Sequence, residues 1–358
     1  MKKSFFKTSL ILAILFLMMP GCLNIWFTTD IHPDGSIGKT IVIEGDSAEI
    51  VDVHLALMKE PGWKKEWTKI EGDKNNPNGS TEDKKDKFKL TLSREFKSVQ
   101  ELNKSMNPAD TNVFTIRTNS TLHRKFRWFF TRFVYEETIL NANPFKKLNY
   151  HDFLSEEEVR LICMTDEARE ADPKYDSVIY KQTDKRYEEY LFRSMYEDFY
   201  ERLLPILNED KSLTLTVQEL DNKKETIYHF LIDSTKGDSP EAILDGFGKV
   251  LQNPAIEVIK SKYINRFDGF SRKLAFYLES SDDSYKFNIR MPGLLLSTNS
   301  NKIEGSATNW EVTFDDFFFR DYTMTAESRM VNTWAFILAG LILLAAMAGL
   351  YSVARRKR

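Results

Sequence analysis

The sequence predicts an α+β fold: a mainly antiparallel sheet built from the two ends of a central body, a helical insertion between those ends, and one C-terminal transmembrane helix. Two patterns carry this prediction. Strand-like segments lie on both sides of a region with helical periodicity, which covers about residues 150–280. An uncharged apolar run near the end of the chain supplies the last helix.

The composition narrows the class further. Apolar residues make up 42% of the 358 residues, and only 2 cysteines accompany 15 glycines and 11 prolines. These values exclude collagen-like, low-complexity and disulfide-stapled proteins, and they leave ample chain for one or two packed cores.

The N-terminus has the pattern of a signal peptide over residues 1–21. Basic residues precede an apolar run over residues 10–19, which is too short to span a bilayer comfortably. Gly21-Cys22 follows and resembles the lipobox of bacterial lipoproteins, in which the cysteine is acylated and becomes the first mature residue. The sequence therefore predicts a lipid, such as palmitate, on Cys22. The alternatives are an ordinary signal peptide and an uncleaved anchor with a chance cysteine.

The C-terminal segment is predicted to cross a membrane. Residues 334–354 carry no charge, and Trp334 and Tyr351 lie near their ends, where aromatic rings favour the membrane interface. The basic residues 355–358 follow directly, so the positive-inside rule predicts a cytoplasmic tail. The expected location is the bacterial cytoplasmic membrane, with a single pass and the body outside the cytoplasm.

The charge distribution supports this topology. The chain has a formal net charge of −3, but removing three lysines at the front and the four basic residues at the end leaves a body of net charge −10. Such a body avoids nucleic acid and anionic lipid headgroups. We therefore expect the membrane as a partner through lipidated Cys22 and residues 334–354, and no nucleic-acid partner.

The N-terminal part of the body, residues 22–150, is predicted to be rich in strands. Residues 24–30 and 39–44 have strand character and enclose a turn with Pro and Gly at residues 32–36. A capped helix is predicted over residues 48–59.

Further strands and one helix are predicted before residue 120. A polar loop over residues 72–87 leads into an alternating strand at 87–92. Residues 98–106 have a helical pattern, and residues 113–118 return to strand character.

The stretch after residue 120 combines basic and aromatic residues. Residues 126–135 carry aromatic and β-branched side chains on both faces, which predicts one long central strand. The run from His123 to Trp128 is also suited to stacking on single-stranded nucleic acid. The acidic, exported body favours the core strand over that use.

The insertion, residues 151–281, is predicted to be helical. Ser155 with three following glutamates indicates a capped helix start, and an apolar stripe indicates a long helix that ends near Leu207. Shorter helical segments follow, including one over residues 255–278, whereas residues 213–217 alternate like a short strand.

Strand patterns return in the C-terminal part, residues 282–330. The predicted strands cover residues 285–290, 310–314 and 322–327. Cys163, in the preceding insertion, lies in an apolar helical context and is predicted to be a buried, inert thiol.

Short motifs at both ends of the body resemble LppM-like bacterial lipoproteins. Residues 28–36 resemble the opening strand and turn of that family. A second set resembles its PG…N…G…W run and consists of Pro292, Gly293, Asn299, Asn301, Gly305 and Trp310. The resemblance implies a β-rich exported domain between a lipobox and a transmembrane helix, with no known catalytic residues. From the residues themselves, Pro292-Gly293 is a turn and Trp310 a core anchor.

No catalytic or metal-binding motif is present in the sequence. It contains no GxSxG, HExxH, P-loop or GxGxxG, and its five histidines are dispersed. No cofactor, metal or catalytic residue is therefore predicted. The leading hypothesis is a non-enzymatic, membrane-anchored protein that binds an envelope component or a partner protein.

Two other functions stay open. The first is a lipid- or amphiphile-binding module with an apolar groove, whose candidate lining residues are Tyr187, Tyr190, Phe192, Phe199 and Tyr200. The second is an envelope hydrolase whose acid and base are not recognisable among 53 acidic residues.

Overall fold

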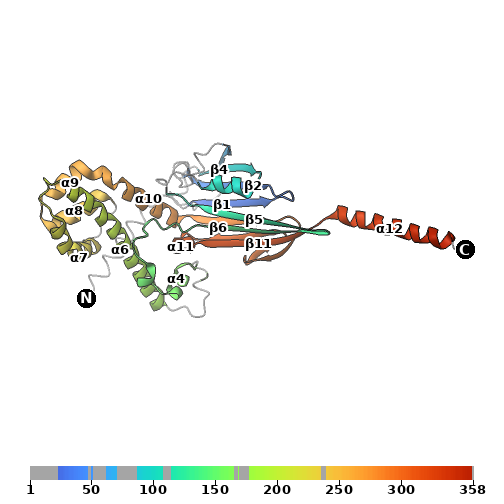
Figure 1. Cartoon of the computed structure of the whole chain (residues 1–358). Coiled ribbons are helices and arrows are strands. Elements are labelled where there is room, and N and C mark those ends of the chain that lie inside the picture. The colour runs from blue at the N-terminus through green and yellow to red at the C-terminus, as the bar shows by residue number, and fades with distance from the viewer. Residues whose placement is uncertain are drawn as a thin grey trace, which may run out of the picture.

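The computed structural model describes residues 23–46, 62–70, 87–107, 114–164, 177–234 and 239–356, together with positions 50 and 168. Two sheets pack face to face in the middle of the molecule, a unit of helices lies at one end, and a single helix leaves the other end (Figure 1). Strands from both ends of the body enter both sheets, which confirms the predicted α+β class. The prediction of one sheet is refined to two.

Sheet A, within the described residues, has seven strands in the order β3-β4-β2-β1-β7-β10-β9. Its strands are β1 (Asn24–Ile31), β2 (Ile37–Asp46), β3 (Lys64–Ile70), β4 (Lys87–Phe96), β7 (Ser284–Arg290), β9 (Lys302–Glu304) and β10 (Ala307–Val312). β1 pairs antiparallel with β2 and parallel with β7, so the two ends of the body meet at this seam. The rings of Phe27 and Phe287 stack across it at 4.6 Å.

Sheet B has the order β5-β6-β11-β8 and is antiparallel throughout its described pairings. Its strands are β5 (Thr118–Arg127), β6 (Phe130–Ile139), β8 (Leu294–Thr298) and β11 (Tyr322–Val331). The short helix α3 (Val99–Met106) protects the edge strand β5, because the Asn103 side chain exchanges two hydrogen bonds with the Ser120 backbone.

The helices between β6 and β7 are α4 (Glu156–Ile162), α6 (Ser177–Glu209), α7 (Val217–Ser234), α8 (Pro240–Leu251), α9 (Ala255–Tyr263) and α10 (Asp268–Asp282), with the short turns η3 (Tyr150–Asp152) and η4 (Ile264–Phe267). The second half of α6 forms the helical unit at the far end of the molecule with α7, α8, α9 and the first part of α10, whereas α4 packs on the sandwich core. The helix α6 belongs to two cores. Tyr190 packs with the sandwich and with α11 (Phe314–Phe318), whereas Phe199 lies in the core of the helical unit.

Several sequence predictions are confirmed. β1 and β2 enclose a turn in which Gly35 adopts a φ of 93°, and α4 begins with a capping box between Ser155 and Glu158. Gly293 has a φ of 80° in the turn between β7 and β8, and Trp310 is buried in the sandwich core.

The predicted long strand over residues 126–135 is wrong. The chain turns back at Trp128 and Phe129, so that β5 and β6 form a hairpin. The carbonyl groups of the turn accept hydrogen bonds from Asn332, which is far away in the sequence. The Asn332 side chain donates to the Trp128 carbonyl at 3.0 Å, and the Asn332 backbone donates to the Phe129 carbonyl at 2.9 Å. A contact between residues two hundred positions apart cannot be deduced from local pattern.

Three other expectations are corrected. The strand expected at residues 113–118 begins only at Thr118. Residues 213–217 form no strand, because the Thr216 hydroxyl caps the start of α7 by accepting from the Glu219 backbone at 3.1 Å. The helix expected over 255–278 is interrupted by η4, where Phe267 turns fully into the core.

Some predictions lie outside the described residues. These are the signal peptide with Cys22, the helix over 48–59 apart from position 50, and the loop over 72–87 apart from Lys87. The strand predicted from Lys87 onwards is present as β4.

The C-terminal helix α12 (Thr333–Arg356) extends away from the sandwich and exposes its apolar side chains (Figure 1). Among the described residues it is the one helix long and apolar enough to cross a membrane. Its 24 residues span about 36 Å, which is more than the roughly 30 Å of the hydrocarbon core of a bilayer.

A buried ion pair joins the two sheets. Lys39 of β2 donates to the Glu137 carboxylate of β6 at 2.6 Å, and the two side chains are 0% and 1% exposed. Lys39 also donates to the Thr29 hydroxyl at 2.7 Å, and Tyr135 donates to Glu137 at 3.1 Å. Burial and the Glu137 charge raise the pKa of Tyr135 well above its usual range, so its phenol stays a hydrogen-bond donor.

A single neutral substitution in this pair is expected to destabilise the sandwich. Lys39→Met leaves a buried carboxylate without its cation, which costs about 3–5 kcal/mol. The double variant Lys39→Met/Glu137→Gln loses less than the two single variants together. The measurement is denaturant unfolding of the full chain in detergent micelles, followed by circular dichroism. The control is Lys302→Met, which breaks the exposed pair with Glu311 and costs under about 1 kcal/mol. An equal loss of stability in Lys39→Met and Lys302→Met contradicts a special role of the buried pair.

Asp283 is expected to shape the pH dependence of stability. It accepts a hydrogen bond from the Leu23 backbone at 3.1 Å, and burial raises its pKa to about 7. Between pH 4 and 7 Asp283 therefore retains a proton in the folded chain that it has lost in the unfolded chain, so its contribution to the free energy of unfolding falls as the pH rises. In urea titrations across that range, the free energy of unfolding of the original chain is expected to fall relative to that of Asp283→Asn as the pH rises. The exposed control Glu304→Gln leaves the slope as it is, and an unchanged slope in Asp283→Asn would refute the assignment.

Candidate functional site

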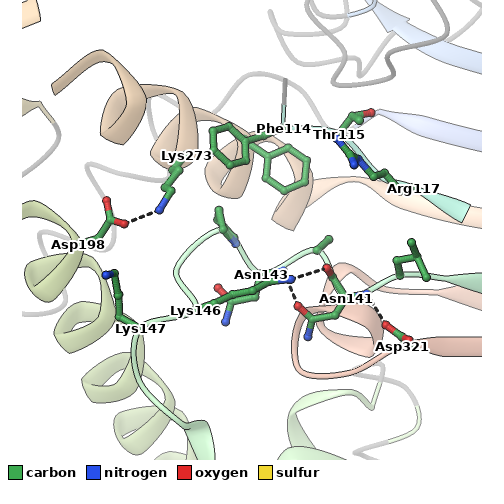
Figure 2. A pocket seen from close by; sticks show the side chains of 14 residues that line it. Phe114, Thr115, Arg117, Asn141, Asn143, Lys146, Lys147, Asp198, Lys273 and Asp321 are labelled. Carbon is green, nitrogen blue, oxygen red and sulfur yellow. Dashed lines mark hydrogen bonds and ion pairs between the residues drawn. The ribbon is translucent and has the colours of Figure 1, made fainter. Parts of the chain in front are cut away.

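A cleft of about 660 Å³ lies between the sandwich and the helical unit. Its walls come from the segment before β5, the connection after β6, α6, α10 and the start of β11 (Figure 2). Phe114 and Phe276 provide an apolar side, and most of the other lining side chains are polar or charged.

The connection after β6 forms the floor of the cleft and is tied to its surroundings by asparagines. The Asn141 backbone donates to Asp321 at 2.7 Å, and the Asn141 side chain donates to the Phe318 carbonyl at 2.9 Å. Asn143 is buried and donates to the Tyr190 hydroxyl at 2.8 Å. These bonds fix the floor both to the sandwich end and to α6.

Basic side chains outnumber acidic ones around the cleft. The charged lining residues are Arg117, Lys146, Lys147, Lys273, Asp198 and Asp321. Asp198 is almost fully buried and bridges Lys273 and Arg202, as the dashed line to Lys273 in Figure 2 marks. Lys147 pairs with Glu201 at the rim.

Lys146 is an exposed cation of this group. Its ammonium donates to the Asn141 carbonyl at 3.1 Å; desolvation lowers its pKa, and the charge of Asp321 opposes that shift. A cation whose hydrogen bond goes to a neutral carbonyl is attracted to an anionic group that approaches it. The cleft is therefore suited to an anionic group on a ligand or partner.

The five aromatic residues proposed to line an apolar groove lie in different places. Tyr190 belongs to the sandwich core, and Tyr187 packs against that core with its hydroxyl donating to Asp315 at 3.0 Å. Phe199 and Tyr200 fill the core of the helical unit, and Phe192 is 40% exposed. The structure thus divides them between two cores and the surface, and Tyr190 alone touches the floor of the cleft, through Asn143.

The cleft itself was not anticipated from the sequence. Its lining residues come from five separated segments, and the one local signal is the Asn-Ala-Asn-Pro run at residues 141–144, which is typical of a loop.

The described residues contain no group of three or more His, Cys, Asp or Glu side chains that could hold a metal ion. Cys163 is half-buried at the end of α4, and its thiol donates to the Asp315 carbonyl at 3.4 Å. This geometry is that of a packed thiol. Cys22, the predicted lipidation site, lies outside the described residues.

Comparisons with known proteins give little. No family model and no curated protein matches this sequence. The chain is similar to one solved structure, the NMR structure of the folded domain of the Mycobacterium tuberculosis LppM protein, at a TM-score of 0.29 and 8% identity, with 88% of this chain and 94% of that chain covered. A likeness of this size carries no argument about fold or function, so the resemblance of the sequence motifs stays a prediction.

Proposed function

We propose that this chain is a single-pass protein of the bacterial cytoplasmic membrane whose extracytoplasmic body binds an envelope component or a partner protein, without catalysing a reaction. The observation that carries the proposal is the basic-lined cleft on an otherwise acidic body. Because Lys146 is an exposed cation there and donates to a neutral carbonyl, the partner presents an anionic group, such as an acidic side chain, to the cleft.

The anchor in this proposal is α12. Its apolar surface is exposed along its length, and Arg355 and Arg356 follow on the side predicted to be cytoplasmic. The body continues the direction of α12 and stands away from the helix start (Figure 1).

The geometry of the body also bears on the predicted lipid at Cys22. Leu23, the next residue, is buried where β1 begins, and its carbonyl accepts from the Ser284 backbone at 2.9 Å. The chain runs from Leu23 along β1 to Thr29, whose hydroxyl bonds to Glu137 of β6. β6 in turn connects Glu137 to Phe130, which lies beside α12. At 3.3 Å per residue these two stretches together cover about 40 Å. Leu23, which follows Cys22 in the sequence, thus lies at the end of the body away from α12.

The alternative function is binding of a lipid or another amphiphile. The apolar side of the cleft, formed by Phe114 and Phe276, together with the basic side chains opposite, suits an acyl chain with an anionic headgroup. The photo-crosslinking experiment described next distinguishes a lipid from a protein partner.

A photo-crosslinking residue in place of Phe114 is expected to capture a protein partner in the membranes of living cells. The matched control replaces Phe192, which is exposed on α6 and does not line the cleft. Lys146→Glu in the Phe114 background is expected to reduce the adduct at least several-fold, because it reverses the charge that meets the partner, whereas Lys211→Glu in the α6–α7 turn leaves it unchanged. Mass spectrometry identifies the adduct. A lipid adduct supports the alternative, and equal adducts at both positions contradict a role for the cleft.

The upright orientation predicts a large distance between the helical unit and the membrane. A fluorophore at position 249 on α8 is expected to transfer little energy to acceptors on lipid headgroups, because the helical unit lies beyond the beginning of β1, at the end of the body away from α12 (Figure 1). A fluorophore at position 97, near the other end of sheet A, is expected to transfer more. Cys22→Ser leaves both values unchanged. Strong transfer from position 249 that Cys22→Ser abolishes would show instead that the body lies on its side, held at both ends.

A further inference from the structure

The tip of the β5–β6 hairpin, residues 126–130, exposes aromatic side chains beside the start of α12. Phe126, Trp128 and Phe129 are 54%, 48% and 37% exposed. Isolated exposed aromatics are ordinary, but three within four residues of a hairpin form a contiguous apolar surface on a water-soluble body. Exposed Leu294 and Val331 on the neighbouring strands extend it.

The tip packs on the first turn of the membrane helix. The Phe126 ring is parallel to the Trp334 ring at 6.2 Å, and Trp128 meets Trp334 edge-on at 5.6 Å. Phe129 lies 4.7 Å from Phe336. Asn332 fastens the junction, since it bonds the carbonyls of Trp128 and Phe129 and accepts from the Thr131 hydroxyl at 2.9 Å.

These contacts set the depth of the tip. Trp334 begins the apolar stretch of α12, and Phe336 lies three residues into the helix, about 4.5 Å along its axis. If α12 crosses the membrane, Trp128 and Phe129 are at the level where aromatic rings concentrate between headgroups and acyl chains.

Cations surround these rings. Lys125 and Arg127 are exposed and make no ion pair with another described residue, whereas Arg132 pairs with Glu327 and Arg329 lies over the Phe130 ring. Lipid phosphates at the same level complement Lys125 and Arg127. The acidic body thus has a locally basic end where it meets the bilayer.

We propose that the hairpin tip is embedded in the extracytoplasmic headgroup layer of the membrane that α12 crosses, with Trp128 and Phe129 at the boundary of the acyl chains and with Lys125 and Arg127 against lipid phosphates. The tip then acts as a second contact with the membrane beside the helix and holds the body upright. This inference rests on the proposed membrane topology of α12.

The test measures quenching of tryptophan fluorescence by lipids brominated near the top of the acyl chains. The full chain carrying Cys22→Ser, so that α12 is the anchor under test, is reconstituted in vesicles that contain anionic phospholipid. The chain has six tryptophans. Trp67 is 47% exposed on β3, an edge strand of sheet A that is remote from the hairpin tip, and it is the matched control for Trp128.

Trp128→Phe is expected to lower the quenched fraction of the emission, because it removes an emitter in contact with lipid. Trp67→Phe is expected to raise that fraction, because it removes an emitter in water. Lys125→Glu/Arg127→Glu is expected to lower it as well, by repelling the tip from the phosphates, whereas Lys211→Glu/Lys223→Glu in the helical unit leaves it unchanged.

Trp334→Phe distinguishes failure of the embedded tip from failure of the proposed topology of α12. If Trp334→Phe lowers the quenched fraction while Trp128→Phe raises it, α12 is in the membrane and the embedded tip is refuted. If both substitutions raise the fraction, the proposed topology of α12 fails with it. A quenched fraction unaffected by Lys125→Glu/Arg127→Glu refutes the contact with phosphates.

Discussion

The ion pair between Lys39 and Glu137 determines how the two sheets meet. A charge in a dry interior is tolerated only opposite its partner and with its remaining donors and acceptors satisfied. Thr29, Tyr135 and Ser120 complete this requirement, with the Tyr135 hydroxyl 3.0 Å from Ser120 Oγ. A slip of β2 or β6 by one residue within its own sheet would turn Lys39 or Glu137 to the opposite face. The pair therefore favours the observed register of both strands.

The helix α6 transmits that fixed geometry to the helical unit. Its first half packs on α11 at the end of the sandwich, and its second half carries the core of the helical unit. One continuous helix serves both cores and so joins the two sides of the cleft. Asn141 and Asn143 fasten the floor to Phe318 and Tyr190 in the sandwich core. The cleft is accordingly a preformed site, and preformed sites bind with less loss of conformational entropy.

The sequence predicts the parts of this molecule that depend on local chemistry. The turn at Gly35, the capping box at Ser155 and the apolar helix at the C-terminus follow from neighbouring residues, and the structure contains all three. The division into two sheets and the cleft depend on contacts between distant segments, so no window of residues contains them. The aromatic stripe of α6 shows the limit well. Its period is right, but Tyr190 and Phe199 serve different cores, which the period alone cannot reveal.

The turn at Trp128 and Phe129 is not predicted by its local sequence either, and the reason is physical. Tight hairpin turns normally use Gly or Asn, and this one places two large aromatic residues where water would solvate them poorly. Part of the reason is Asn332, which satisfies carbonyls that a glycine turn would leave to water or to its own backbone. The other part is the lipid surroundings that we propose for the tip. Aromatic residues are unfavourable at an aqueous turn but favourable at a lipid interface, so the composition of the turn is consistent once the bilayer replaces water around it. A pattern that predicts a buried strand in water describes equally well a segment buried partly in lipid, and this is why the pattern of residues 126–135 predicts one interior strand.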